Sequence, residues 1–285
     1  MSGKLFIIGT PIGNLGDISP RVIDALNTCD LILAEDTRIS IKLLNHLSIK
    51  KRMLSCHKFN EHERLRLLGE VNEQSQTIGL ISDAGMPLIS DPGHPVVQAA
   101  IALGMEVIPI AGPSAFVLAL VGSGLPLDKF VFEGFLPDKK GELNSRLAVV
   151  AKDPRTSVYY VSPHKAERTV ESFIEHCGGD RPACLVRELT KMHEQFIRGT
   201  LAQIFDHIKG TEVRGECVLV VGGCTTVDVD MSDWLDDSAK KEAVMNYIDD
   251  ALNSGVKLSR AAAEAARQFS ISRSDIYREA LSRLE

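Results

Sequence analysis

The sequence has no apolar run long enough to cross a bilayer, which takes about 20 consecutive apolar residues. Its first residues lead directly into the strand-like Leu5–Ile8, without the basic stretch and long apolar run of a signal peptide. We therefore expect a protein that stays in the cytoplasm.

Patterned cysteines are also absent. None of the six cysteines forms a C-x-x-C pair, and most lie inside or beside apolar runs. A zinc site or a disulfide framework needs tighter, regular spacing. We expect buried free thiols, as in a reducing compartment, and no metal site.

An excess of positive charge is lacking as well, since the formal net charge is −6. Residues 226–250 contain eight acidic side chains and two lysines, and this local excess equals the net charge of the whole chain. The remainder is neutral overall and can still carry basic faces, on which phosphate binding depends. Charge therefore does not exclude RNA as a partner.

The first 125 residues alternate short aliphatic runs with helical patterns. Such runs, without alternation of polar and apolar residues, are typical of parallel strands buried on both faces. Ser19-Pro20 predicts a helix start, and Gly104 predicts the end of a helix over Pro95–Leu103. The predicted strands are Leu5–Ile8, Leu31–Ala34, Met53–Cys56, Ile78–Ile81 and Val107–Ile110.

The pattern changes after residue 125. Two predicted strands, 183–188 and 194–198, are close enough in sequence to form a hairpin, which predicts a mixed second sheet. The other predicted strands are 130–135, 157–161 and 217–221, and the predicted helices are 141–152, 164–177 and 200–209. We predict an α/β protein with two α/β lobes, residues 1–125 with a parallel sheet and residues 126–225 with a mixed sheet. An acidic linker over 226–256 and a helical module over 257–285 follow.

Unusual residues gather where predicted parallel strands end, which is where α/β sheets bind ligands. The glycines of the first such loop stand at positions 9, 13 and 16, so they match neither G-x-G-x-x-G nor a Walker motif. This spacing argues against a dinucleotide dehydrogenase, although turn formation alone could also account for it.

Two later loops are more informative. The loop from Ser82 to Gly93 is rich in glycine and proline and is bracketed by Asp83 and Asp91. A carboxylate at a strand end can bind ribose hydroxyls or an amino group, while helix capping is the alternative and the preferred interpretation of Asp91. Ser114 opens a predicted helix over 114–121, either as a simple N-cap or as part of an anion site.

Seven motifs, in this order, resemble the family of small-subunit ribosomal RNA methyltransferases I within the tetrapyrrole-methylase superfamily. The resemblance covers residues 3–223 and extends more loosely to the helical tail. The motifs are Gly9–Asn14, Ala34–Arg38, Ser82–Gly93, Ala111–Ala115, Phe132–Pro137, Ser162–Lys165 and Arg187–Lys191.

This resemblance implies a homodimer that transfers the methyl group of S-adenosylmethionine to a ribose 2′-hydroxyl. The implied target is cytidine 1402 in the decoding centre of 16S ribosomal RNA, with the cofactor between the lobes. By motif position, the implied cofactor contacts are Pro11, Asp83, Met86, Ser114, Ala115, Val161 and Leu189. Met86 replaces a threonine that is common in the family, and Val161 replaces a common glutamate.

A ribose hydroxyl is a poor nucleophile while it is protonated, so a general base would help. Glu35 and Asp36 follow the second predicted strand and are candidates, with capping or an ion pair to Arg38 as the alternative. His57 follows the third strand, where a structural polar role is the stronger interpretation.

Basic residues of the second lobe are candidates for RNA contact, although a solvated face would account for them too. They are Lys139, Lys140, Arg146, Lys165 and Arg168. In the tail, Lys257–Leu284 shows two helical patterns that break near Ser272, which suits a nucleic-acid module or a packing module. A porphyrinoid C-methyltransferase and a non-catalytic RNA-binding assembly factor remain as alternative functions, and the motifs favour the RNA enzyme.

Overall fold

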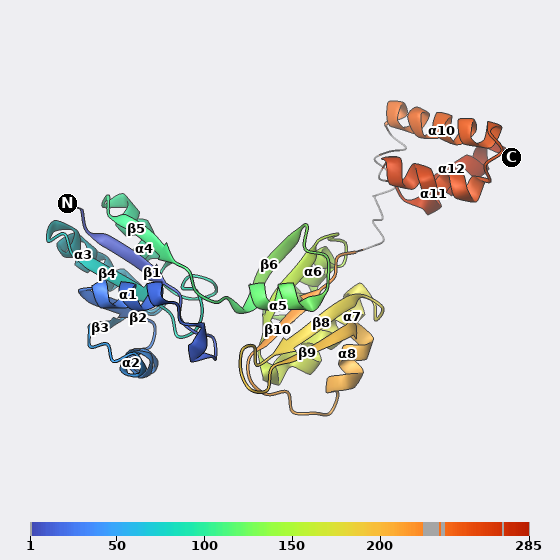
Figure 1. Cartoon of the computed structure of the whole chain (residues 1–285). Helices are drawn as coiled ribbons and strands as arrows, with labels where there is room; N and C mark the ends of the chain where they lie inside the picture. Colours follow the sequence, from blue (N-terminus) through green and yellow to red (C-terminus); the bar gives the residue numbers. More distant parts are fainter. Residues whose placement is uncertain (1, 225–233, 235–236, 270, 285) are drawn as a thin grey trace.

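A computed structural model describes residues 2–224, 234, 237–269 and 271–284. It contains two α/β lobes and a helical C-terminal module (Figure 1). The first sheet is fully parallel and has the strand order β3-β2-β4-β1-β5, as predicted for a parallel sheet. Its strands are β1 Lys4–Ile8, β2 Leu31–Ala34, β3 Arg52–Ser55, β4 Thr77–Ile81 and β5 Glu106–Ile110.

Helices cover both faces of this sheet, which buries the aliphatic strands in two separate clusters. The Ser19 side chain accepts a hydrogen bond from the Val22 N–H and so caps α1, and Gly104 adopts a left-handed conformation just after α4. Both predicted signals are therefore confirmed. The helices of this lobe are η1 Leu15–Asp17, α1 Pro20–Thr28, α2 Thr37–His46, α3 Glu61–Glu73 and α4 His94–Ala102.

The second sheet has the order β6-β7-β10-β8-β9. Strands β6 and β7 are parallel, whereas the other neighbours are antiparallel, so the predicted mixed sheet and the β8–β9 hairpin are confirmed. These strands are β6 Phe130–Phe135, β7 Thr156–Val161, β8 Pro182–Arg187, β9 Gln195–Thr200 and β10 Cys217–Val221. Helices α6 Lys140–Val150, α7 Ala166–Cys177 and α8 Leu201–Ile208 share one cluster with the sheet.

Helix α5, Ala115–Ser123, packs on the opposite face of this second sheet, although its sequence belongs to the end of the first lobe. Its buried Ala119 and Leu120 share a cluster with Val158 of β7 and Val218 of β10. Since α5 begins directly after β5 and its loop, the link between the lobes is short.

The C-terminal module consists of α10 Ser238–Asn253, α11 Leu258–Phe269 and α12 Arg273–Leu284. Trp234 and residues of all three helices form a separate apolar cluster. Residues 238–253, expected inside an acidic linker, therefore belong to the module. This helix was not predicted from the sequence because most of it lies within the acidic stretch of residues 226–250. Its apolar residues Val244, Met245 and Ile248 lie on one buried face. Residues 225–233 of the expected linker lie outside the described residues.

All six cysteines are free, and five of them are buried, while Cys177 is half-buried. Burial raises the pKa of the Cys29 thiol to about 12. In the described ranges, no helix is both long enough and apolar enough to span a bilayer.

Candidate active site

A cavity of about 370 Å³ lies between the two lobes. Its walls come from the ends of β2, β4 and β5 in the first lobe, and from β6, β7 and β10 in the second. The lining residues are Ile12, Glu35, Asp83, Ala84, Gly85, Met86, Ile89, Ser90, Asp91, Ser114, Ala115, Phe135, Tyr160, Val161, Ser162, Pro163, Glu216, Cys217 and Val218.

Close backbone packing brings the first-lobe loops together. A Cβ on Gly9 would lie 2.6 Å from the Gly112 Cα, so both positions need glycine for the two loops to touch. Thr10 and Gly85 exchange two backbone hydrogen bonds of 2.9 and 3.0 Å. Three loops that are far apart in sequence thus form one wall.

Non-glycine residues with a left-handed backbone occur in pairs in two loops, one of which lines the cavity. Leu88 (φ 75°) and Ser90 (φ 70°) lie in the loop after β4, and Glu188 (φ 54°) and Thr190 (φ 65°) lie between β8 and β9. Such conformations are unfavourable for residues with a side chain and persist where the surrounding structure enforces them, commonly at functional sites. The long loop predicted to shape a site therefore does carry strain.

Three carboxylates of the first lobe face this cavity, Glu35, Asp83 and Asp91, and Glu216 of the second lobe also lines it. Burial is the main cause that raises the pKa of Glu35, Asp83 and Asp91, and repulsion from a nearby carboxylate adds to it in each case. Asp83 Oδ1 accepts the Asp36 N–H at 3.0 Å, while no described residue donates to its Oδ2. These partly desolvated negative charges suit a positively charged ligand.

The preferred interpretation of Asp91 as a helix cap is wrong. The N-cap of α4 is Gly93, whose N–H donates to Glu61 Oε2 at 2.8 Å. Asp91 instead lines the cavity. Gly93 also needs its left-handed conformation (φ 117°), which an aspartate would adopt less readily.

The structure separates the two base candidates. Asp36 caps α2 by accepting the Arg38 N–H and forms a two-pronged ion pair with the Arg38 guanidinium. Hydrogen bonds from Arg38 lower the pKa of Asp36 to about 2, so Asp36 is a weak base. It also does not line the cavity. Glu35 lines the cavity and has a raised pKa. Glu35 is therefore the better placed of the two base candidates.

Of the seven predicted cofactor contacts, five line the cavity: Asp83, Met86, Ser114, Ala115 and Val161. The Ser114 side chain does not cap α5, and its buried Oγ has no hydrogen-bond partner among the described residues.

The other two predicted contacts lie elsewhere. Pro11 stands between Thr10 and the lining residue Ile12, without itself lining the cavity. Leu189 is buried in the apolar cluster beneath the second sheet. His57 does not line the cavity either, and its Nδ1 accepts a hydrogen bond from the Phe59 N–H, which agrees with a structural role.

Several residues that line the cavity were not predicted from the sequence. Glu216, Cys217 and Val218 come from the start of β10, whereas ligand-binding residues were expected only at the carboxyl ends of strands. Because β10 runs antiparallel to β7, its first residue pairs with Val161, the last residue of β7. The predicted mixed sheet was the signal that could have located them. Tyr160 was also missed, and burial raises the pKa of its phenol.

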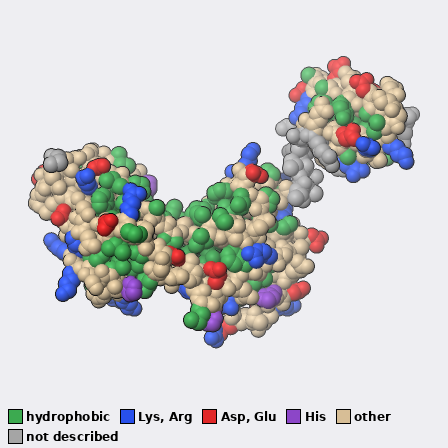
Figure 2. All heavy atoms as spheres, viewed as in Figure 1, with side chains coloured by type: hydrophobic (Ala, Val, Ile, Leu, Met, Phe, Trp, Pro, Cys, Tyr) green, Lys and Arg blue, Asp and Glu red, His purple; other side chains and the backbone are tan. Residues whose placement is uncertain are grey.

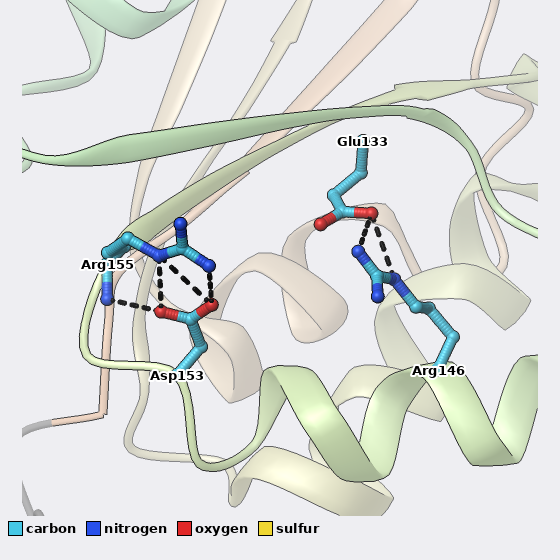
Figure 3. Close-up of polar contacts among 4 residues, drawn as sticks. All are labelled: Glu133, Arg146, Asp153 and Arg155. Carbon is cyan, nitrogen blue, oxygen red and sulfur yellow. Dashed lines mark hydrogen bonds and ion pairs between the residues drawn. The ribbon is translucent and has the colours of Figure 1, made fainter.

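Among the predicted RNA ligands, Arg146 has another role. Its Nε donates to Glu133 Oε2 at 2.9 Å, and Glu133 lies where β6 bulges (Figure 3). This ion pair ties α6 to β6, as the nearby Asp153–Arg155 pair closes the turn into β7 (Figure 3). The half-exposed Arg146 side chain thus already has a carboxylate partner within the second lobe, which makes it a weaker candidate for RNA contact than the other four.

The remaining four basic residues are exposed. Lys139 pairs with Glu142, and Lys140 begins α6. Lys165 pairs with Asp138, and Arg168 makes no ion pair with any described residue. Lys165 and Arg168 line a second cavity, which adjoins the first.

Comparisons with known proteins agree with this geometry. Residues 4–204 match the family model for tetrapyrrole (corrin/porphyrin) methylases. The chain is 39% identical to ribosomal RNA small subunit methyltransferase I of Pseudomonas aeruginosa, over 99% of this chain and 98% of the relative. It is also 39% identical to the protein of that name from Synechocystis sp., over 96% of each chain.

Among solved structures, the methyltransferase CobJ covers 78% of this chain and 95% of its own, with a TM-score of 0.57. At 21% sequence identity, this likeness concerns the fold alone. The two-lobed fold is thus shared with methyltransferases of this kind.

Proposed function

The chain belongs to the ribosomal RNA small subunit methyltransferase I family of tetrapyrrole methylases, and from this we propose that it methylates a ribose 2′-hydroxyl of 16S ribosomal RNA. It is an S-adenosylmethionine-dependent methyltransferase. The finer assignment, cytidine 1402 of the decoding centre, rests on the family resemblance of the motifs. We place the reaction in the cytoplasm, where this RNA is found.

The observation that carries the proposal is the match between the cavity and the cofactor. S-adenosylmethionine is cationic at its sulfonium and its amino group, and it supplies an electrophilic methyl group when bound. The cavity offers three partly buried carboxylates, the unpartnered hydroxyl of Ser114 and apolar walls. Among the described residues, no group of side chains could hold a metal ion.

We propose that Asp83 and Ser114 hold the polar ends of the cofactor, while Met86, Ala115 and Val161 contact its apolar surface. Pro11 and Leu189 act indirectly, through the lining residue Ile12: Pro11 precedes it in sequence, and Leu189 shares its apolar cluster. The protein's main contribution is alignment, because displacement at a sulfonium carbon needs the nucleophile in line with the leaving group. Glu35 is the proposed acceptor of the ribose proton.

The test of this function is methyl transfer to 16S RNA, or to small subunits, that lack the modification. Labelled S-adenosylmethionine should transfer its methyl group, and nuclease mapping should place the label on one ribose. Label on a base, or on a porphyrinoid and not on RNA, would contradict the proposal.

We also propose that two copies of the chain associate through α5. This helix is apolar all round, which is typical of a helix buried on every side. Its Val117 and Val121 are exposed at 42% and 66%, and Phe130 of the edge strand β6 is exposed at 45%. Figure 2 shows hydrophobic side chains gathered over α5 and β6. A second copy would cover this surface.

Val121→Lys should therefore raise the dimer dissociation constant about 100-fold or more, because it would bury an unpaired charge at the interface. Sedimentation equilibrium measures this constant. Val149→Lys is the control, since Val149 is also an exposed valine (56%) but lies on α6. A wild-type monomer, or equal constants for both variants, would contradict the proposed interface.

We propose further that the C-terminal module holds RNA. Its apolar cluster contains no described residue before Trp234, and the clusters of the lobes contain none after Val221. The module should therefore be removable. Its exposed cations include Lys257 and Arg273, while Arg260 and Arg283 lie near Glu264 and Glu279. Exposed pairs of this kind are weak enough to open toward phosphate.

Deleting residues 229–285 should leave a folded protein with normal affinity for S-adenosylmethionine. We expect the RNA concentration for half-maximal rate to rise about 10-fold, with a shallower salt dependence, because fewer phosphates are neutralised. Calorimetry with the cofactor and initial rates at several salt concentrations test this. Aggregation, or unchanged RNA affinity and salt slope, would instead indicate a packing role.

A further inference from the structure

A second cavity, of about 420 Å³, adjoins the cofactor cavity in the second lobe. The two share Phe135, Tyr160, Val161 and Ser162 as lining residues, so a group bound in one lies beside a group bound in the other. The shared residues come from the ends of β6 and β7 and the residue that follows.

One side of the second cavity is aromatic and apolar. Phe135 is 62% exposed, and its ring centroid lies 5.5 Å from that of Tyr160 at an interplanar angle of 57°. Leu136, Pro137 and Leu143 extend this side. An exposed aromatic ring at the mouth of a cavity is a suitable platform for stacking a planar base.

The other side is basic and polar. It comes from η2 Pro163–Lys165 and α7, with Lys165, Arg168, Thr169 and Ser172. Arg168 makes no ion pair with any described residue, so its guanidinium can bind an anion without losing a partner. Among the described residues, Lys165 pairs only with Asp138, whose side chain is 79% exposed, and such an exposed pair opens at little cost.

We propose that this cavity binds the nucleotide whose ribose is methylated, turned out of the RNA strand. Its base stacks on Phe135, and its phosphate binds Arg168 and Lys165. The wall shared by both cavities then places the ribose next to the cofactor. A nucleotide combines a planar face with an anion, and the cavity presents a partner for each. This inference rests on the proposed function, since it identifies the substrate subsite of the same reaction.

Asp138 competes with the phosphate in this arrangement. It neutralises Lys165 in the free protein and would repel an incoming phosphate. Removing its charge should therefore strengthen RNA binding, while removing Arg168 should weaken it. These two opposite effects distinguish a phosphate site from a role in folding, which would weaken binding in both variants.

The experiment measures KM for unmethylated 16S RNA or subunits, whichever the wild type methylates, together with the Kd of S-adenosylmethionine. Arg168→Ala should raise KM about 10-fold, since a charge-assisted hydrogen bond is lost, and reduce the salt slope by about one. Phe135→Ala should raise KM as well. Asp138→Asn should lower KM several-fold. Cofactor affinity should stay unchanged in Arg168→Ala and Asp138→Asn, since neither residue lines the cofactor cavity.

Lys209→Ala and Asp206→Asn are matched controls, because they remove the same charges from the second lobe but line neither cavity. Cytidine 5′-monophosphate at millimolar concentration should inhibit competitively against RNA, and Arg168→Ala should weaken that inhibition. The subsite is refuted if Arg168→Ala changes the KM for RNA no more than Lys209→Ala does. It is also refuted if Arg168→Ala weakens cofactor binding as much as it raises KM. A wild type that methylates no ribosomal RNA would refute the proposed function instead, whereas direct binding of the nucleotide would still test the cavity.

Discussion

Replacing Glu35 with glutamine should lower the single-turnover rate of methyl transfer about 100-fold or more, because glutamine cannot accept the ribose proton. The amide oxygen of the new side chain can still accept the weak hydrogen bond from the Asp83 N–H, which is 3.4 Å from Glu35 Oε2. The wall should therefore stay intact. Affinity for S-adenosylmethionine should change only a few-fold, since Asp83 and Asp91 keep the cavity acidic.

The pH dependence gives an independent check. Only the deprotonated Glu35 can act as a base, so the rate should fall as the pH falls through its pKa. Burial and the nearby Asp91 raise that pKa above the ordinary value of a glutamate, so the acid limb should begin at a higher pH. This limb should be absent from the Glu35→Gln profile.

Asp36→Asn is the matched control, since it changes the neighbouring carboxylate, which Arg38 holds outside the cavity. Asparagine can also cap α2. The single-turnover rate of Asp36→Asn should therefore be near that of the wild type. If both variants turn over normally, alignment is the whole mechanism. If Glu35→Gln loses cofactor affinity but keeps its rate at saturation, Glu35 binds the cofactor and is not the base.

Asp83→Ala should weaken S-adenosylmethionine binding by about 1.5–3 kcal/mol, which corresponds to roughly 10- to 150-fold in Kd. A cationic ligand would lose a charge-assisted hydrogen bond to a carboxylate whose Oδ2 accepts no bond from the described residues. Titration calorimetry measures the change directly. Unchanged affinity would remove Asp83 from the cofactor site.

A second variant separates charge from local structure. Asp83→Asn keeps an oxygen that can accept the Asp36 N–H and removes only the charge. We expect it to weaken binding nearly as much as alanine does. Asp24→Asn, an exposed carboxylate on α1 of the same lobe, should have no effect. If only the alanine variant binds poorly, Asp83 acts by holding the start of α2.

The sequence by itself determined the strands and the loops that carry the site. Each aliphatic run, such as Leu31–Ala34, became a strand within one or two residues, because a strand buried on both faces needs unbroken apolar side chains. The loop at 82–93 was identified because glycine, proline and aspartate gathered at the end of a parallel strand are typical of a binding loop. These properties are local, so they can be read along the chain.

The tertiary structure decided which neighbours in sequence face the cavity. Glu35 and Asp36 are adjacent, and the Asp36–Arg38 pair is local. Glu35, however, lines a cavity only because the loop after β4 and the second lobe lie opposite it. Likewise, the sequence shows Arg146 only as a basic residue, whereas the fold pairs it with Glu133 of β6. The start of β10 enters the cavity only because that strand is antiparallel to β7. Such features depend on contacts between distant segments, which periodicity and spacing do not specify.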